Sequence, residues 1–350
     1  MAKNYLALFN ELKARASDQP EHLNSRVLVI DGLNTFIRSY SVSPVTNLHG
    51  EHVGGISGFL LSIGHAIKTI NPTRVIIVFD GKNGSAKRRA LYSEYKSQRK
   101  LKVRLNRSET VDKQDNQLEQ LMRLVEYLGV LPFTTVIMDN TEADDVIAYI
   151  AKDYFKDKDS QVFIMSSDKD FMQLVDQQVH VWSPTKKKLY YTDDVYEEFG
   201  VMPENFALYR ALTGDASDNI PGVQGLGAKT LAERFPRMFE REPIHIQQFF
   251  DYAITLHDSN PKIKLYEKVV QSKADVETYY KIVQLSETMI APATRFKVLD
   301  MLNSSIGTFS KIKFHSMLIE DGMTNTIRNV DMWIREITLK LDQFALQERQ

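Results

Sequence analysis

The stretch Arg26-Val27-Leu28-Val29-Ile30-Asp31-Gly32 decides the fold, because a short apolar run ends there in an acid and a glycine. The same pattern recurs at residues 74–81 and, with two serines before the acid, at residues 162–168. Between the first two runs, residues 56–70 have the periodicity of a helix. Buried strands that alternate with helices are typical of an α/β fold, so we predict a mainly parallel central sheet flanked by helices.

Acidic residues follow these strands and gather in two further short motifs. Asp31, Asp80 and Asp168 end the three apolar runs, and parallel sheets bind ligands at the carboxyl ends of their strands. Thr141 is the expected N-cap of a helix whose first turn carries three acids, where the helix dipole favours negative charge. Together with the acids of the runs at 168–170 and 214–219, the candidate carboxylates are Asp31, Asp80, Glu142, Asp144, Asp145, Asp168, Asp170, Asp215 and Asp218.

Electrostatics indicates what a gathering of these acids is for. Two like charges 4 Å apart repel by about 4 kcal/mol at an effective dielectric constant near 20, so several carboxylates at one edge need cations among them. Oxygen ligands in a chain with no cysteine suit magnesium or manganese and not zinc. Two such ions about 3.5–4 Å apart activate a water and stabilise the leaving oxygen of a phosphodiester. The alternative is that the acids are scattered helix caps and surface residues.

Composition excludes several classes of protein. The 350 residues allow two or three domains, and 43% hydrophobic with 25% charged residues is ordinary for a soluble globular protein. The absence of cysteine excludes disulfides, thiolate metal sites and cysteine nucleophiles. The longest apolar run, Val75-Ile76-Ile77-Val78-Phe79, is too short to cross a bilayer, and the N-terminus does not resemble a secretory signal. We therefore expect a cytoplasmic protein.

Charge is segregated along the chain, although the 44 basic and 45 acidic residues nearly cancel. From Lys82 to Arg107 the basic residues outnumber the acids strongly, and Glu94 is the one acid among them. A basic segment beside concentrated carboxylates indicates a protein that binds a polyanion at one surface and metal ions at another. The alternative is a solvated, charged helix.

A glycine-rich run follows the last acids. Gly222-Val223-Gln224-Gly225-Leu226-Gly227-Ala228-Lys229-Thr230 departs from a phosphate-binding P-loop, because Ala228 separates glycine from the Lys-Thr pair and no strand precedes it. We predict a tight hairpin between a helix ending near Thr213 and a helix beginning near Lys229. Its backbone N–H groups and Lys229 would bind a phosphate without reading base sequence. The alternative is an ordinary packing corner between two helices.

These motifs resemble those of the structure-specific 5′ nucleases, a family of flap endonucleases, phage 5′–3′ exonucleases and 5′-nuclease domains of bacterial DNA polymerases I. The matching motifs, in the family's order, are Ile30-Asp31-Gly32, Val78-Phe79-Asp80, the acids of 142–145, Ser167-Asp168-Lys169-Asp170 and the run TGDASDNIPGV at 213–223. The resemblance covers roughly residues 26–240. Val181-Trp182-Ser183-Pro184, followed by three lysines, is most similar to the ribonucleases H of T-even-type phages, which implies a phage origin.

The resemblance implies a role for each matching residue. Asp31, Asp80, Glu142, Asp144 and Asp145 would hold a first magnesium ion directly or through water, Asp168 would lie between the ions, and Asp170, Asp215 and Asp218 would hold the second. Lys96 would orient the scissile phosphate, and Arg88 would hold the same phosphate. The nucleic-acid contacts would come from Arg38, Arg99, Gly222, Gly225, Gly227 and Lys229.

The resemblance also implies a domain organisation. A helical extension at residues 1–25 would precede a catalytic core at 26–200, with a helical arch at about 97–120. A duplex-binding helix–three-turn–helix would occupy residues 201–240, with a potassium ion on its carbonyl groups, and a helical region would follow at 241–350. The ions would be two Mg²⁺, with Mn²⁺ as the expected substitute.

The predicted function is a magnesium-dependent 5′–3′ exonuclease and flap endonuclease that removes RNA primers and flaps in replication. The expected partners are DNA with 5′ flaps or nicks, RNA/DNA hybrid, a single-strand-binding protein and a sliding clamp. We expect a monomer in the cytoplasm, that of the host if the chain is phage-encoded.

Two other functions remain open. A PIN-like single-strand ribonuclease shares the acid-edged sheet but offers no reason for the glycine hairpin. A catalytically inactive scaffold would bind DNA junctions without cutting them. A two-aspartate phosphatase of the haloacid type is disfavoured because Leu33 stands where its second aspartate belongs.

Overall fold

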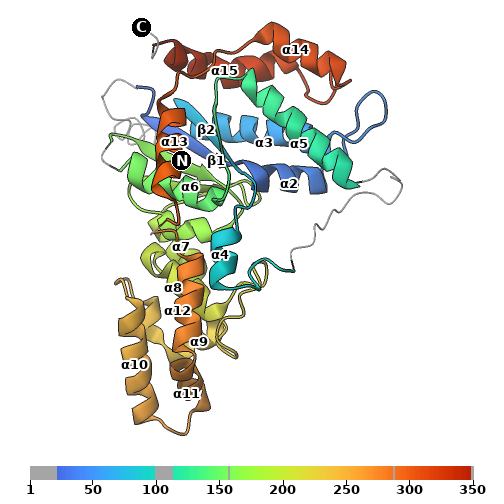
Figure 1. Ribbon diagram of the computed structural model, residues 1–350. Helices are drawn as coiled ribbons and strands as arrows, with labels where there is room; N and C mark the ends of the chain where they lie inside the picture. The colour runs from blue at the N-terminus through green and yellow to red at the C-terminus, as the bar shows by residue number, and fades with distance from the viewer. Residues whose placement is uncertain (1–21, 99–112, 157, 287, 348–350) are drawn as a thin grey trace, which may run out of the picture.

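The structure is a computed structural model that describes residues 22–98, 113–156, 158–286 and 288–347. Its centre is a six-stranded sheet in the order β3-β2-β1-β4-β5-β6 (Figure 1). The strands are β1 (Arg26–Asp31), β2 (Arg74–Asp80), β3 (Thr134–Met138), β4 (Gln161–Met165), β5 (Val179–Ser183) and β6 (Lys188–Tyr190). All neighbours pair in parallel except β5 and β6. The prediction of a mainly parallel sheet is confirmed, and the three predicted strands are its central members β2, β1 and β4.

Side chains alternate between two cores on the two faces of the sheet, as the strand period of two requires. On β1, Leu28 and Ile30 enter one core and Val27 and Val29 enter the other. Residues of β1 and β2 are almost fully buried, which explains why these strands are continuous apolar runs. A sheet covered on both faces leaves its strand ends as the place for polar chemistry.

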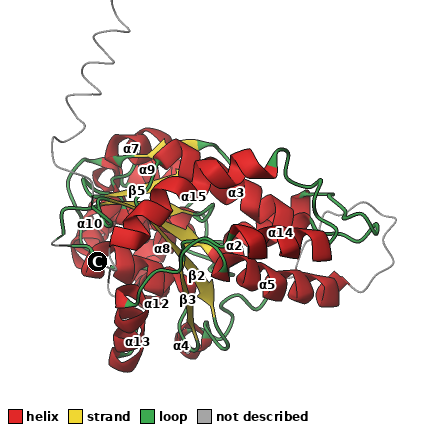
Figure 2. Cartoon of the chain, turned by 90° about the horizontal axis from the view of Figure 1, so that it is seen from above, coloured by secondary structure: helices red, strands yellow, loops and turns green. Residues whose placement is uncertain are grey.

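The first face is covered by helices from the N-terminal and the C-terminal parts of the described chain (Figure 2). They are α2 (Gly32–Val42), α3 (Gly54–Ile70), α5 (Lys113–Gly129), α14 (Lys311–Glu320) and α15 (Val330–Gln347). Trp333 of α15 packs directly on Gly64 of α3, where a Cβ atom would lie 2.5 Å from the indole nitrogen. Leu341 and Phe344 are buried, so the amphipathic C-terminal helix packs into the core.

The second face is covered by shorter elements. They are α6 (Ala143–Tyr149), which continues as the π-helical turn η1 (Ile150–Tyr154), the 3₁₀-helix η2 (Lys169–Leu174) and α13 (Pro292–Asn303). Both α6 and η2 begin at the carboxyl edge of the sheet, so their first residues face the strand ends.

A third core holds a group of helices that lies at the opposite end of the molecule from α14 and α15 (Figure 1). The elements in this part are α4 (Ala86–Leu91), α8 (Pro203–Thr213), α9 (Ala228–Arg234), η3 (Pro236–Phe239), α10 (Ile246–Ser259), α11 (Lys264–Gln271) and α12 (Lys273–Val283). Helix α7 (Thr192–Phe199) precedes them and packs Val195 and Phe199 against the second core. The predicted helical region at 241–350 is therefore shared among three cores, because α10–α12 join this group, α13 covers the second face and α14–α15 cover the first.

The C-terminal part of the predicted arch at 97–120 is helical. Residues 113–120 belong to α5, and the side chain of Gln120 is buried against α3, where it accepts a hydrogen bond from the N–H of Gly55 at 2.8 Å. Residues 99–112, which include Arg99, lie outside the described residues, as does the predicted helix within residues 1–20. Among the described helices, none is long and apolar enough to cross a membrane.

Candidate active site

The site lies at the carboxyl edge of the sheet, where β1 separates β2 from β4 and the strand order reverses. Asp31 is the last residue of β1 and the N-cap of α2, accepting a hydrogen bond from the N–H of Asn34 at 3.1 Å. Its second oxygen accepts a hydrogen bond from the Ser166 hydroxyl at 3.0 Å, and the same hydroxyl accepts one from the N–H of Asp168. Ser166 therefore joins the acids at the ends of β1 and β4.

Asp80, at the end of β2, brings the start of α6 to the same edge. Its carboxylate accepts a hydrogen bond from the N–H of Ala143 at 2.9 Å. The prediction that Thr141 caps this helix is wrong: Glu142 is the N-cap, and the Thr141 hydroxyl finds no hydrogen-bond partner among the described residues. The physical reason is that the carboxylate of Asp80 takes the N–H of the first turn, which leaves no role for a local cap.

Burial and mutual repulsion dominate the electrostatics of these acids. Burial and the charges of Asp80 and Asp168 together raise the pKa of Asp31 to about 7, against two hydrogen bonds that lower it. Burial also raises the pKa of Asp144 well above its ordinary value; Lys96 opposes this rise, and the charges of Asp168 and Asp31 add to it. The four acids Asp31, Asp80, Asp144 and Asp168 thus form an edge group, in which burial and the charges of neighbouring acids keep the pKa values of Asp31 and Asp144 raised.

A second group of acids consists of Asp170, near the sheet edge, and Asp215 and Asp218, in the loop after α8. One ligand atom each from Asp170, Asp215 and Asp218 lie within 4.8 Å of one another. Asp170 stands in the first turn of η2, and the other two come from a loop closed by hydrogen bonds of 2.7 and 2.8 Å between the backbones of Asp215 and Ile220. Burial and the nearby charge of Asp168 raise the pKa of Asp170 to about 7, against the lowering effect of Arg210.

Asp168 acts on both groups. Its charge raises the pKa of Asp31, Asp144 and Asp170. A small cavity of about 10 Å³, lined among others by Asp144, Asp170 and Asp218, connects the groups and has room for about one water. Seven of the nine predicted carboxylates are therefore gathered at one edge.

The remaining two carboxylates bind cations of the protein. Arg88 is 3% exposed and donates hydrogen bonds to Glu142 at 2.5 Å and to Asp145 at 2.5 and 3.1 Å. Lys96 donates to Glu142 at 2.6 Å, and the Tyr95 hydroxyl donates to the same carboxylate at 3.2 Å. Burial alone would raise the pKa of Glu142, but Arg88 and Lys96 hold it below its ordinary value.

The structure places Arg88 beneath the site, where its buried guanidinium is bonded to two carboxylates. Its contact with a substrate phosphate stays a prediction. Lys96 lies nearer the surface, with its side chain 12% exposed. We therefore assign Arg88 to holding the start of α6 against the base of the predicted arch.

Sequence reasoning missed Arg210, in the last turn of α8. Its guanidinium donates to Asp170 at 2.9 Å and forms an ion pair with Asp215. Burial would lower the pKa of Arg210, but Asp170 and Asp215 raise it above its ordinary value. The available signal was a basic residue one helical turn before the Gly214-Asp215 step.

The predicted glycine hairpin is confirmed between α8 and α9. Gly222 has φ +63°, and a Cβ atom there would lie 2.4 Å from the backbone nitrogen of Gly214, so the two segments pack as closely as they do because both are glycines. Gly225 also has positive φ, Gly227 is the N-cap of α9, and Lys229 is exposed on the first turn.

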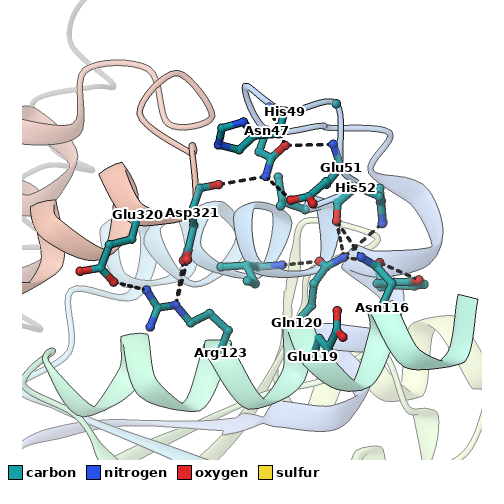
Figure 3. A pocket seen from close by; sticks show the side chains of 14 residues that line it. Asn47, His49, Glu51, His52, Asn116, Glu119, Gln120, Arg123, Glu320 and Asp321 are labelled. Carbon is teal, nitrogen blue, oxygen red and sulfur yellow. Dashed lines mark hydrogen bonds and ion pairs between the residues drawn. The ribbon is translucent and has the colours of Figure 1, made fainter. Parts of the chain in front are cut away.

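Two features lie away from these acids. Arg38, on α2, donates a hydrogen bond to the Ser62 hydroxyl of α3 at 2.8 Å. A separate cavity of about 440 Å³ lies between the loop after α2, the start of α5 and the end of α14 (Figure 3). Its wall is held by contacts among its own residues, such as Arg123 with Glu320 and Asp321, and none of the described residues predicted for the site lines it.

Comparison with known proteins agrees with this geometry. The family described as "5′–3′ exonuclease, N-terminal resolvase-like domain" matches residues 26–200. A 5′–3′ exonuclease of Aquifex aeolicus is 30% identical over 263 residues, which cover 73% of this chain and 80% of that protein. The chain belongs to the 5′–3′ exonuclease family. It is therefore placed among phosphodiester hydrolases.

Two further comparisons show how much of this chain, and of each relative, is matched. A thermostable DNA polymerase I of Thermus filiformis is 37% identical over 205 residues, which cover 59% of this chain but only 23% of the polymerase. The chain thus spans about a quarter of the length of that relative. The bacteriophage T5 flap endonuclease, solved as a pseudo-enzyme–product complex with DNA and metal ions, has the same fold, with a TM-score of 0.58, 23% identity, and coverage of 85% of this chain and 99% of that one.

Proposed function

We propose that this chain is a magnesium-dependent 5′–3′ exonuclease and flap endonuclease that cuts DNA near the junction of single strand and duplex. The observation that carries the proposal is the acidic group Asp170, Asp215 and Asp218. It joins the sheet edge to the loop that opens the glycine hairpin, so one loop serves both the acids and the surface we assign to duplex DNA.

The acids fit divalent cations. The edge group and the second group offer oxygen donors alone, which suits Mg²⁺ or Mn²⁺. Raised pKa values of Asp31 and Asp170 indicate carboxylates that need added positive charge to ionise. We propose that Asp31, Asp80, Asp144 and Asp168 hold a first ion, and that Asp168 and the second group hold another. When bound, such ions supply Lewis acidity to the attacking water and the leaving oxygen.

The basic side chains of the site would have different roles. Lys96 would orient the scissile phosphate and stabilise its charge, because it stands between Glu142 and the surface. Arg88 would keep Glu142 and Asp145 behind the first ion. Arg210 would hold Asp170 and Asp215 apart at the spacing that a second ion requires.

The rest of the chain would bind the substrate. Gly225, Gly227 and Lys229, exposed at the hairpin, would bind the duplex backbone, with a potassium ion on nearby carbonyl groups. The predicted arch at about 97–120, of which residues 99–112 lie outside the described residues, would cover a 5′ single strand. We further propose removal of RNA primers from RNA/DNA hybrid in the cytoplasm, aided by a single-strand-binding protein and a sliding clamp.

A labelled flap tests the proposal. A 5′-labelled flap duplex and the matching single strand are incubated with the protein, with and without Mg²⁺. Cutting near the junction, with metal only and much faster than on the single strand, is the expected result. Equal cutting of both substrates would favour the PIN-like ribonuclease, and binding without cutting would favour the inactive scaffold.

A further inference from the structure

The turn that carries Lys96 is bonded to the loop that carries Asp215 and Asp218. The N–H of Lys96 donates to the carbonyl of Asp218 at 2.9 Å. The side-chain amide of Asn219 donates to the carbonyl of Glu94 at 2.9 Å and to the Ser97 hydroxyl at 3.1 Å. Three hydrogen bonds therefore connect two segments that lie more than a hundred residues apart in the sequence.

The backbone of Lys96 requires such support. Its φ is +54°, in the left-handed region that residues with a Cβ atom seldom adopt. Conformations of this kind persist where surrounding contacts determine them, and they gather at functional sites. Asn219 is itself left-handed at φ +60°, a conformation that asparagine tolerates well. The Lys96 turn is therefore held from outside, and the amide of Asn219 bonds to both of its flanks.

We propose that Asn219 is a positioning residue for Lys96. Its amide holds residues 94–97 in the turn that directs the lysine ammonium to Glu142, 2.6 Å away, at the border of the edge group. The proposal deepens the proposed function and rests on it for the role of Lys96. It also links the second acidic group mechanically to the base of the predicted arch.

A purely local role for Asn219 is disfavoured by its contacts. The loop is already closed without this side chain, by the two backbone bonds between Asp215 and Ile220 and by two bonds from Ser217 to the Asp215 carboxylate. The amide of Asn219 points across to the Lys96 turn and not into the loop. Its removal should therefore leave the acids in place and release the lysine.

The variant Asn219→Gly tests this, because glycine keeps the left-handed backbone and removes the amide. We expect the single-turnover rate on a 5′-flap duplex at saturating Mg²⁺ to fall about 10- to 100-fold, as small misplacements of a catalytic group do. The melting temperature, the DNA dissociation constant and the Mg²⁺ concentration for half-maximal rate should not change. Asn71→Gly, at another left-handed asparagine far from the site, is the matched control and should keep the wild-type rate.

A double-mutant cycle shows whether Asn219 acts through Lys96. In a Lys96→Ala background, Asn219→Gly should change the rate by less than about twofold, because the ammonium that Asn219 positions is already absent. An equal loss in both backgrounds, or a raised Mg²⁺ requirement, would overturn the proposal by placing Asn219 with the acids.

A second measurement needs no cleavage. Reductive ¹³C-methylation of the lysines gives an NMR signal for Lys96, assigned by its loss in Lys96→Arg. In the metal-free protein, Asn219→Gly should shift or broaden this signal, whereas Asn71→Gly should not. An unchanged signal would contradict the proposal even in an inactive protein, whereas failure of the wild type to cut the flap with Mg²⁺ would contradict the proposed function.

Discussion

Two neighbouring sets of carboxylates at the start of α6 behave in opposite ways. Glu142 and Asp145 are bonded to Arg88 and Lys96, and the pKa of Glu142 is lowered. Asp144, which stands between them in the sequence, faces the other acids of the edge group, and its pKa is raised by burial and by their charges. Carboxylates at the start of α6 thus either bind a basic side chain of the protein or lie where a cation from solution would bind.

Loss of a negative charge from the edge group should reduce the rate of the cleavage step strongly. Asp168→Asn removes the carboxylate that influences both acidic groups, so we expect cleavage of a flap duplex to fall by at least about 10³-fold while DNA binding persists. Rates are measured in single turnover and binding by anisotropy. Asp193→Asn, an exposed aspartate on α7, is the control, and substantial Mg²⁺-dependent turnover by the Asp168 variant would remove the contrast between the two sets.

Loss of the positive charge that pairs with Glu142 and Asp145 should reduce the free energy of unfolding strongly. Arg88→Met leaves Glu142 and Asp145 buried without their shared cation, and breaking a buried pair in this way costs about 3–5 kcal/mol in the free energy of unfolding. Urea denaturation measures it. Arg241→Met, which loses an exposed pair with Asp193, should cost about 0–1 kcal/mol, and equal losses in the two variants would contradict the account.

The free energy of unfolding of the metal-free protein should depend on pH, because Asp31 in the edge group and Asp170 in the second group change their pKa values on folding. The pKa values of Asp31 and Asp170 rise from 3.8 to about 7 on folding, so the folded state binds more protons between these values and its stability falls as pH rises from about 4 to about 7. Mg²⁺ offsets the ionised charges, so it should raise the melting temperature more at pH 8 than at pH 5. A stabilisation by Mg²⁺ that is larger at pH 5 would show that the acids do not titrate as described.

The smallest effect is expected at the hairpin, away from both sets. Lys229→Ala should weaken binding of duplex DNA a few-fold and reduce the slope of log affinity against log salt by about 1, as loss of one phosphate contact does. Lys313→Ala, an exposed lysine on α14, should leave the salt slope unchanged. Identical slopes for wild type and the Lys229 variant would remove this residue from the DNA contacts.

The central strands could be predicted because both of their faces are buried, which makes them apolar runs. The edge strand β3 was not predicted, since its five residues begin with two threonines and leave an apolar run of only three. Helix α2 was missed because it begins directly after β1 and its half-buried side carries the polar residues Asn34, Arg38 and Ser41.

Within the site, most of the acids could be found because they stand at a strand end or a helix start, and Asp215 and Asp218 because they lie in the short acidic run 214–219. Arg210 and Asn219 could not be assigned, because their partners lie 40 residues away at Asp170 and 125 residues away at Glu94. The buried position of Arg88 could not be predicted either, since a basic segment of this composition is usually exposed.

Calorimetric titration of the metal-free protein with Mg²⁺, in two buffers of different ionisation enthalpy, tests the central contrast most directly. At pH 6.5 a share of Asp31 and Asp170 is protonated, so the bound metal should displace protons, and the apparent heat should differ between the buffers. At pH 8.5, where Asp31 and Asp170 are largely ionised before metal binds, this difference should be smaller. Equal heats in both buffers at pH 6.5, with Mg²⁺ bound, would contradict the account, because the edge acids would then already carry their charges without metal.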